Sequence, residues 1–159
     1  IREKIPDIIL RTTVITGFPG EGTEEFEELA EFINEFEFDR FGCFAFSPQP
    51  GTNAALLENE LDEQERLDRC DILMNDQYSV IEAKNLEKVG NVYQVLIEGY
   101  DGYSDIYSGR SYMDAPEIDT KIIFTSDKVH EEGEFADVLI LGISEYDLLG
   151  RETAGGEER

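Results

Sequence analysis

The sequence predicts an α/β unit followed by an all-β unit, the latter a small antiparallel barrel of the OB-like kind. Strand and helix patterns alternate up to about residue 87, whereas the remaining residues carry short strand patterns and turns without a helix. Hydrophobic residues make up 40% of the 159 residues, which is enough for a packed core despite a net charge of −24. We therefore expect domains at 1–87 and 88–152 and a disordered tail at 153–159.

The α/β unit is expected to begin with a strand, a helix and a second strand. Residues 8–16 form a β-branched run that is apolar on both faces apart from threonines, as in a strand buried on two sides. Thr23 is expected to cap the helix, with two glutamates in its first turn. Residues 38–46 form the second strand. The buried stripe of the helix is expected to comprise Phe26, Leu29, Ile33 and Phe36.

A longer helix is expected at about residues 62–84, after a loop at 47–52. Its buried stripe is expected to comprise Leu67, Cys70, Met74, Tyr78 and Ile81. A strand, a helix and a strand with short joins predict a βαβ unit and hence a parallel sheet.

The second half contains five short strand patterns separated by turn-rich segments. They cover residues 89–98, 106–112, 120–125, 135–143 and 146–150. Five short strands in about seventy residues predict a small barrel.

The composition excludes several classes of partner and location. The chain has 13 Lys and Arg against 37 Asp and Glu, so nucleic acid or an anionic lipid surface would be repelled. No apolar run approaches the roughly eighteen residues of a membrane span, and residues 1–10 do not form a signal peptide, so the chain is expected to begin within a domain. Cys43 and Cys70 fit neither a disulfide framework nor a metal motif and are expected to be buried free thiols, which favours a reducing, cytoplasmic location.

Three segments resemble the methylthiotransferase family of radical S-adenosylmethionine (SAM) enzymes. They are TTVITGFPGEGTEEF at 12–26, FAFSPQPGT at 44–52 and YSGRSYMDAPEID at 107–119. The third resembles the branch that methylthiolates an aspartate of a basic small-subunit ribosomal protein, number twelve in its series. The resemblance implies that residues 1–87 are the C-terminal portion of a radical SAM (β/α) partial barrel and that residues 88–152 are a TRAM domain, a small β-barrel.

The resemblance also implies cofactors, namely SAM and 4Fe–4S clusters. The family holds one cluster with a Cys-x-x-x-Cys-x-x-Cys loop and a second in an N-terminal domain. Neither motif is in the sequence, and Cys43 and Cys70 do not match cluster ligands. We therefore expect no metal ligand and no catalytic residue here, and we hypothesise that the chain by itself is catalytically inactive.

The turn after the first strand is the candidate cofactor site. Ligands of parallel α/β sheets bind at the carboxyl ends of strands, and in the family this strand lies along the adenosine. The residues that the resemblance assigns to SAM binding are Ile15, Gly17, Phe18, Pro19 and Gly20, with Phe46 and Ser47 from the end of the next strand. From the residues alone, an ordinary βα turn and strand end remain the alternative.

The connection between two strands at 110–119 is the candidate substrate-docking segment. Its members are Arg110, Tyr112, Asp114, Glu117 and Asp119. A loop that closes the barrel is an equally good interpretation of the same residues. His130 has no partner at a matched spacing and is expected to be a solvated loop histidine.

The charge of the second half favours a protein substrate over RNA. Residues 88–159 hold 6 basic and 16 acidic side chains, whereas RNA binding needs cations that neutralise phosphates. An acidic barrel would instead attract the basic ribosomal protein. The alternatives are a tRNA-modifying methylthiotransferase of the same family and a non-enzymatic acidic OB-like module that binds a basic partner.

Overall fold

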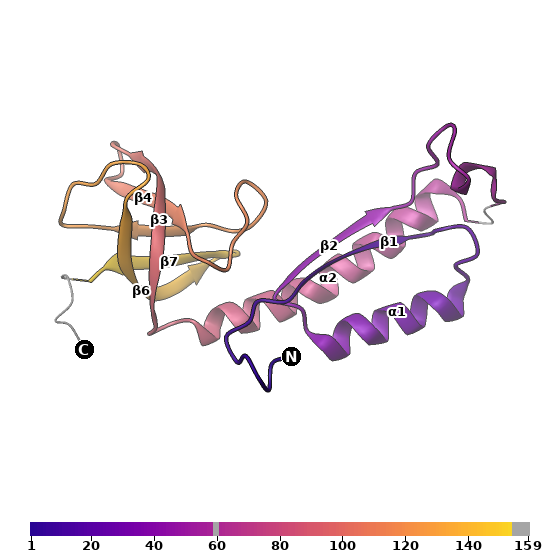
Figure 1. Cartoon of the computed structure of the whole chain (residues 1–159), viewed down its shortest axis with the longest axis horizontal. Coiled ribbons are helices and arrows are strands. Elements are labelled where there is room, and N and C mark those ends of the chain that lie inside the picture. Colours follow the sequence, from indigo (N-terminus) through magenta and orange to yellow (C-terminus); the bar gives the residue numbers. More distant parts are fainter. Residues whose placement is uncertain (59–60, 154–159) are drawn as a thin grey trace. The chain divides into compact units, whose positions relative to one another are not determined.

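The computed structural model describes residues 1–58 and 61–153 (Figure 1). The chain divides into two compact units, Ile1–Ile81 and Glu82–Arg159. Of the tail expected at 153–159, all but the first residue lies outside the described part. Each unit is described by itself below.

The first unit is built around two parallel strands. Its elements follow in the order β1 (Arg11–Thr16), α1 (Thr23–Phe36), β2 (Arg40–Ala45), the short 3-10 helix η1 (Ala54–Leu56) and α2 (Glu63–Glu87). Strand β1 pairs with β2 from Arg11 opposite Arg40 to Thr16 opposite Ala45. Figure 1 shows both long helices running beside this strand pair. The predicted βαβ unit with a parallel sheet is confirmed.

The two faces of the sheet differ in burial. Thr16 and Cys43 are buried on the side of α2, where Thr16 Oγ1 donates a hydrogen bond to the carbonyl oxygen of Arg66 (3.1 Å). On the opposite face, the register partners Ile15 and Phe44 are 54% and 64% exposed. The expectation of a strand buried on both sides is therefore wrong for the described residues. The apolar run of β1 reflects a face that the described residues of the first unit leave exposed.

Helix α1 begins one residue earlier than its polar residues suggest. Gly22, and not Thr23, is the N-cap, and its N–H donates a hydrogen bond to Glu25 Oε2 (2.9 Å). Of the expected stripe, only Ile33 is fully buried, and Phe36 is exposed. A glycine N-cap has no side chain that could bond the free backbone N–H groups at the start of the helix. The carboxylate of Glu25 instead accepts the hydrogen bond of the Gly22 N–H.

The fully buried side chains of α2 lie beside the stripe that its apolar residues predict, of which Cys70, Met74 and Ile81 are half-buried. The buried side chains are Arg69, Leu73, Gln77 and Asn85. Leu67 and Tyr78, which belong to the expected stripe, are exposed. A hydrophobicity pattern cannot find a buried face that carries arginine, glutamine and asparagine. No helix in the described part of the chain is long and apolar enough to cross a membrane.

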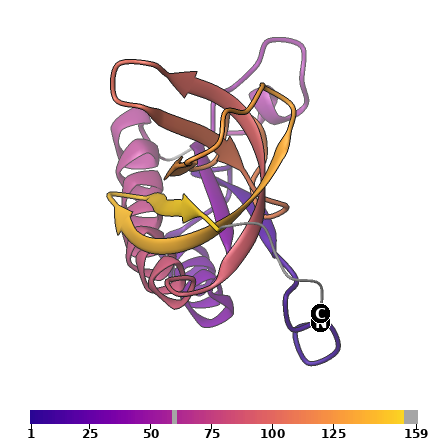
Figure 2. The ribbon, with the colours of Figure 1, turned by 90° about the vertical axis from the view of Figure 1, so that its left-hand side faces the viewer.

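The second unit is a closed barrel of five strands (Figure 2). The strands are β3 (Val92–Asp101), β4 (Ile106–Arg110), β5 (Ile122–Thr125), β6 (Phe135–Ser144) and β7 (Asp147–Glu152), and their order around the ring is β3-β4-β5-β7-β6. The predicted small barrel is confirmed, with one difference: β5 and β7 pair in parallel, so the barrel is not wholly antiparallel.

The interior of the barrel is filled with apolar side chains, as expected for a small closed barrel. The buried cluster comprises Val95, Ile97, Tyr107, Ile122, Phe124, Ala136, Val138, Ile140 and Leu148. These residues alternate with outward-facing ones along their strands. The core is therefore complete within this unit.

Candidate functional site

The turn after β1 is fixed by two glycines and a glutamate. Gly17 and Gly20 have φ values of 71° and 95°, which L side chains rarely adopt. The N–H of Gly17 donates a hydrogen bond to Glu21 Oε1 (2.9 Å). Glu21 thereby closes the turn on itself.

Arg69 of α2 holds the same glutamate from the other side. Its guanidinium forms an ion pair with Glu21 Oε1 (2.8 Å), and the two side chains are 9% and 11% exposed. Arg69 also donates to the carbonyl oxygens of Glu21 (3.3 Å) and Gly22 (3.0 Å), pairs with Glu65 (3.1 Å) and lies over the ring of Phe26. A nearly buried, multiply bonded guanidinium of this kind positions a turn more rigidly than an exposed ion pair does.

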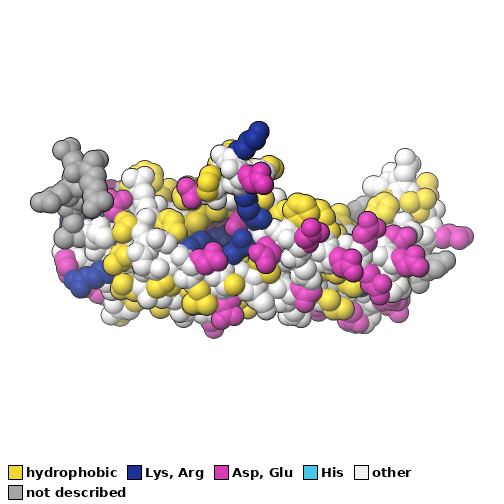
Figure 3. Space-filling view, turned by 90° about the horizontal axis from the view of Figure 1, so that it is seen from below, with side chains coloured by type: hydrophobic (Ala, Val, Ile, Leu, Met, Phe, Trp, Pro, Cys, Tyr) yellow, Lys and Arg dark blue, Asp and Glu magenta, His cyan; other side chains and the backbone are white. Residues whose placement is uncertain are grey.

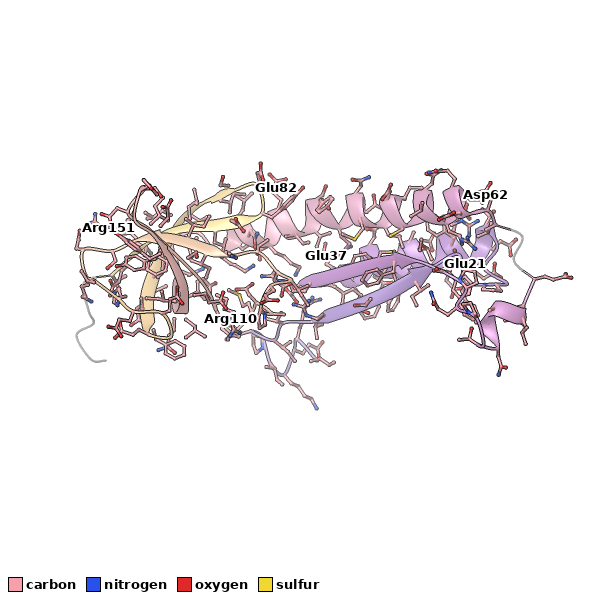
Figure 4. The ribbon with its side chains drawn as sticks, turned by 90° about the horizontal axis from the view of Figure 1, so that it is seen from above. Glu21, Glu37, Asp62, Glu82, Arg110 and Arg151 are labelled. Carbon is pink, nitrogen blue, oxygen red and sulfur yellow. The ribbon has the colours of Figure 1, made fainter. Side chains whose placement is uncertain are left out.

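Gly17 is required by its neighbour in the same chain. A Cβ placed on Gly17 would lie 2.1 Å from Cγ of Arg66, the second arginine near the start of α2. The aliphatic part of Arg66 thus occupies the space that a side chain at position 17 would need. In Figure 4, Glu21 and Asp62 mark the end of the first unit at which the turn and the start of α2 meet.

A pocket of about 450 Å³ lies at the carboxyl end of β2. Phe46, Ser47, Glu63 and Arg66 are among its lining residues. The ring of Phe18 packs edge-on against Phe46, with centroids 5.1 Å apart. The Nε atom of Arg66 is buried and has no hydrogen-bond partner among the described residues. Phe46 gives the pocket an aromatic side and Arg66 a cationic one, and such a lining fits a ligand that carries both a flat ring and an anionic group.

The structure thus brings some of the predicted cofactor residues together. Phe18, Phe46 and Ser47 lie at one edge of the sheet, whereas Ile15 points from the open face and Gly20 lines a separate pocket of about 510 Å³ together with Glu21 and Arg69. Pro19 belongs to the turn between these pockets. The assignment of the seven residues to SAM binding stays a prediction.

Arg66 and Arg69 are the site residues that the sequence interpretation missed. Both stand at the start of α2, three positions apart, and between Arg40 and Lys84 they are the only cations. Isolated cations on an otherwise acidic helix were the available signal, because each must find carboxylates or carbonyls nearby. The apolar residues of the helix predict a buried stripe that includes neither arginine.

The two cysteines are 27 positions apart in the sequence but interact in space. The Cys43 thiol is buried and lies 3.9 Å from Thr16 Oγ1. Burial and a hydrogen bond with Cys70 raise the pKa of Cys43 to about 12. Cys43 is therefore a protonated, unreactive thiol near neutral pH. Among the described residues no group of three or more His, Cys, Asp or Glu is placed to hold a metal ion.

In the second unit, the 110–119 segment is largely held by its own contacts. Arg110 forms an ion pair with Glu98 (2.6 Å). Asp114 is buried and accepts hydrogen bonds from Ser111 N–H (3.1 Å) and Ser111 Oγ (2.8 Å), and Asp119 accepts one from Ala115 N–H (2.6 Å). These carboxylates shape the loop that closes the barrel.

Two members of that segment are placed differently. The side chain of Tyr112 is 67% exposed. Glu117 has a φ of 63°, and its backbone is therefore in the left-handed region. The proposal that all five residues dock a substrate stays a prediction, and Tyr112 is the member best placed to touch a partner.

His130 is not the solvated loop histidine that we expected. Its side chain is 11% exposed, with Nε2 2.8 Å from Glu152 Oε2 and Nδ1 3.3 Å from Glu134 Oε2. The His130 ring packs edge-on against the Tyr107 ring, with centroids 5.6 Å apart. The backbone N–H of His130 donates a hydrogen bond to the Tyr107 hydroxyl (3.2 Å). Glu152 also pairs with Lys128 (2.7 Å) and accepts from Ser126 Oγ.

These contacts shift the pKa values of His130 and Glu152. The hydrogen bond with Glu152 raises the pKa of His130 above its usual value. Burial by itself raises the pKa of Glu152, but hydrogen bonds from His130, Lys128 and Ser126 outweigh it and lower the pKa to about 2. The ionised Glu152 and its partner Lys128 therefore make the cluster a charged clamp between the β5–β6 loop and β7, and protonation of His130 strengthens the clamp.

Comparisons with known proteins agree with this architecture. Residues 89–152, which include all five barrel strands, match the family model of the TRAM domain. It is 45% identical to the "Ribosomal protein uS12 methylthiotransferase RimO" of Clostridioides difficile and 46% identical to the protein of that name from Pelotomaculum thermopropionicum, in each case over 94% of the chain and 34% of the relative. The protein of that name from Acetivibrio thermocellus is 39% identical over 94% of the chain and 33% of its own length.

The chain spans about a third of the length of these curated relatives. In each case 150 or 151 residues of the chain align, so the similarity covers both units. Over this third of their length, the chain is therefore similar to the RimO methylthiotransferases in both of its units.

Proposed function

We propose that the chain is the C-terminal third of a radical SAM methylthiotransferase that modifies an aspartate of ribosomal protein uS12. The observation that carries this proposal is the 39–46% identity over 94% of the chain, to relatives that carry that name. A cytoplasmic location follows from such a substrate.

The first unit would supply the last strands and helices of the radical SAM (β/α) partial barrel. The exposed apolar face of the β1–β2 sheet, with Ile15 and Phe44, supports this proposal because strands of such a barrel are covered on both faces. The missing cover would be the interior of the full barrel.

The pocket at the carboxyl end of β2 would form part of the SAM site. Phe18 and Phe46 would offer an apolar wall to the adenine, and the backbone of Ser47 would offer hydrogen bonds at the strand end. Bound SAM would supply the radical that removes hydrogen from the aspartate Cβ before the methylthio group is installed there. Arg69 and Glu21 would keep the turn rigid and limit access of water.

The barrel would dock the protein substrate. Residues 88–159 hold 6 basic against 16 acidic side chains, which favours a basic polypeptide and disfavours RNA. Tyr112 and Glu117 would be candidate contacts, while Arg110, Asp114 and Asp119 would hold the segment in shape. The tRNA-modifying branch and a non-enzymatic acidic module remain the competing functions.

A chimeric enzyme tests the proposal. The aligned C-terminal third of the Clostridioides difficile relative is replaced by this chain, and the purified, cluster-loaded chimera is incubated with SAM, a one-electron reductant, a sulfide source and uS12. We expect uS12 to gain the mass of one methylthio group less the hydrogen that it replaces, on an aspartate. Modification of tRNA in place of uS12 would support the competing branch, and a folded, SAM-binding chimera that modifies neither would support a non-enzymatic module.

A further inference from the structure

Two loops lie together at one end of the barrel. The β3–β4 hairpin loop covers 102–105 and the β5–β6 loop covers 126–134, and we call this end the loop surface. The Tyr107 hydroxyl donates to the carbonyl oxygen of Lys128 (3.3 Å). Ile97 exchanges two backbone hydrogen bonds with the second loop, one with Gly133 and one with Glu134, both 2.9 Å. The loops are therefore held to the barrel frame.

Apolar side chains stand out from the loop surface. Tyr103 is fully exposed and Val129 is 94% exposed. Tyr100 and Phe135, at the adjoining strand ends, are exposed as well. Exposed aromatic side chains that share one region of a rigid surface are typical anchors of protein–protein interfaces.

The cations of the loop surface are all held by its own carboxylates. Lys128 pairs with Glu152 (2.7 Å) and Arg151 pairs with Asp127 (2.7 Å). His130 lies between Glu134 and Glu152. A phosphate backbone would therefore find no uncommitted cation here among the described residues.

Two neighbouring carboxylates of the loop surface differ from the others because they form no ion pair among the described residues. Glu131 and Glu132 are exposed, and no ion pair in the described part of the chain uses them. Exposed carboxylates beside apolar anchors form the polar rim that suits Lys and Arg side chains of a partner.

At the opposite end of the barrel, carboxylates accept hydrogen bonds from nearby backbone and hydroxyl groups. There Asp114 and Asp119 accept hydrogen bonds within their own loop, and Asp147 accepts one from Lys121 N–H (2.8 Å). Figure 4 shows Arg110 and Arg151 well apart on the barrel, near its two ends. Carboxylates committed to the backbone have less to offer a partner than those of the loop surface.

We propose that the loop surface is where the barrel engages a basic polypeptide, with Tyr103 and Val129 as apolar anchors and Glu131 and Glu132 as partners for its Lys and Arg side chains. This inference rests on the proposed function, which supplies the basic ribosomal protein, and adds the surface that receives it. The partner segment that fits is extended, cationic and interrupted by apolar side chains.

Binding of purified uS12 to the chain tests the inference, measured by titration calorimetry at low salt and at about 0.15 M salt. Two double variants address the loop surface: Tyr103→Ser with Val129→Ser, and Glu131→Gln with Glu132→Gln. Val92→Ser, at the end of β3 far from the 102–105 loop, is the matched control, because this apolar side chain is also exposed and belongs to no proposed contact. Amide spectra of each variant verify that the barrel is folded.

We expect the apolar double variant to weaken binding about tenfold. The charge double variant should weaken it about threefold at low salt and show a shallower salt dependence. The control should stay within about twofold of the parent.

The outcomes separate the two proposals. If the parent binds uS12 and the loop variants bind equally well, the inference is wrong while the proposed partner stands. If the parent does not bind uS12 at either salt concentration, the proposed partner fails and the inference with it. Binding of a single-stranded RNA oligonucleotide that the loop variants abolish would also overturn the inference.

Discussion

One carboxylate connects the β5–β6 loop to the last strand of the barrel. Glu152 is 7% exposed and receives His130, Lys128 and Ser126, residues 22 to 26 positions away. Each of these contacts closes a long loop, so the group orders the loop at the level of tertiary structure. The loop surface therefore depends on a charged cluster for its shape.

The cluster makes stability depend on pH. The pKa of His130 is raised, so its contribution is fully present below its unfolded value of about 6.5 and is lost as pH rises through the folded value. The pKa of Glu152 is lowered to about 2, so its contribution is present above its unfolded value of about 4.3 and is lost as pH falls toward about 2. Both contributions coincide between about pH 4.5 and 6.5.

His130→Gln tests this dependence. We expect the variant to lose about 1–2 kcal/mol of unfolding free energy at about pH 5.5 and clearly less at about pH 9, because a smaller fraction of the histidine is protonated there. Urea unfolding followed by tyrosine fluorescence measures the effect, because six of the seven tyrosines lie between residues 93 and 146. Glu132→Gln, at a neighbouring exposed position, is the control. A loss that is equal at both pH values would contradict the charged clamp.

At the scale of elements, the contact between the β1–α1 turn and α2 is the most demanding. Gly17→Ala combines a positive φ with a Cβ 2.1 Å from Arg66 Cγ. Gly20→Ala, in the same turn, has a positive φ but nothing within 4 Å of the new Cβ. The pair therefore separates backbone strain from steric overlap.

We expect Gly17→Ala to destabilise the first unit by about 3 kcal/mol and Gly20→Ala by about 1 kcal/mol. Thermal unfolding followed by the helical circular dichroism signal reports on this unit, because α1 lies within it, as does most of α2. Equal losses in the two variants would mean that Arg66 moves aside at no cost.

The elements also show where sequence patterns succeed and fail. Alternating patterns and turn residues predicted the five barrel strands, because each strand has one face in a core made by the barrel itself. The buried face of α2 was missed because Arg69 and Gln77 occupy it, and their burial depends on partners elsewhere in the fold. His130 was missed for the same reason, since its partner Glu152 comes 22 positions later.

The candidate site was predictable to a similar extent. A strand followed by a glycine-rich turn predicted a site at the carboxyl edge of the sheet, and Phe18 and Phe46 do meet there. That Gly17 makes room for Arg66 could not be predicted, because the contact joins residues 49 positions apart. The sequence pattern predicts the local turn, but it does not predict which distant side chain packs against that turn.

At the scale of the whole molecule, the net charge of −24 dominates. Figure 3 shows acidic side chains gathered over the surface that α1 forms. They belong to Glu24, Glu25, Glu27, Glu28, Glu31 and Glu35, all exposed. No ion pair in the described part of the chain uses them, and the last turn of α1 carries no cation. Mutual repulsion therefore opposes the compact state.

Screening this repulsion should stabilise the chain. We expect the urea midpoint, followed by circular dichroism, to rise as sodium chloride increases from about 0.02 M to about 0.5 M, because the Debye length then falls well below the spacing of distant surface charges. The opposing effect is the weakening of exposed ion pairs such as Arg151–Asp127, and each such pair is worth little.

A triple variant identifies the source of the salt effect. Glu27→Gln, Glu28→Gln and Glu31→Gln together remove three of the α1 charges without removing a side-chain hydrogen bond or ion pair of the described residues. If repulsion along α1 matters, the triple variant is more stable than the parent at low salt and gains less from added salt. If salt instead acted by strengthening apolar burial, parent and variant would gain equally, since both bury the same core. A midpoint that falls with salt in the parent would mean that the ion pairs outweigh the repulsion, contrary to their exposure.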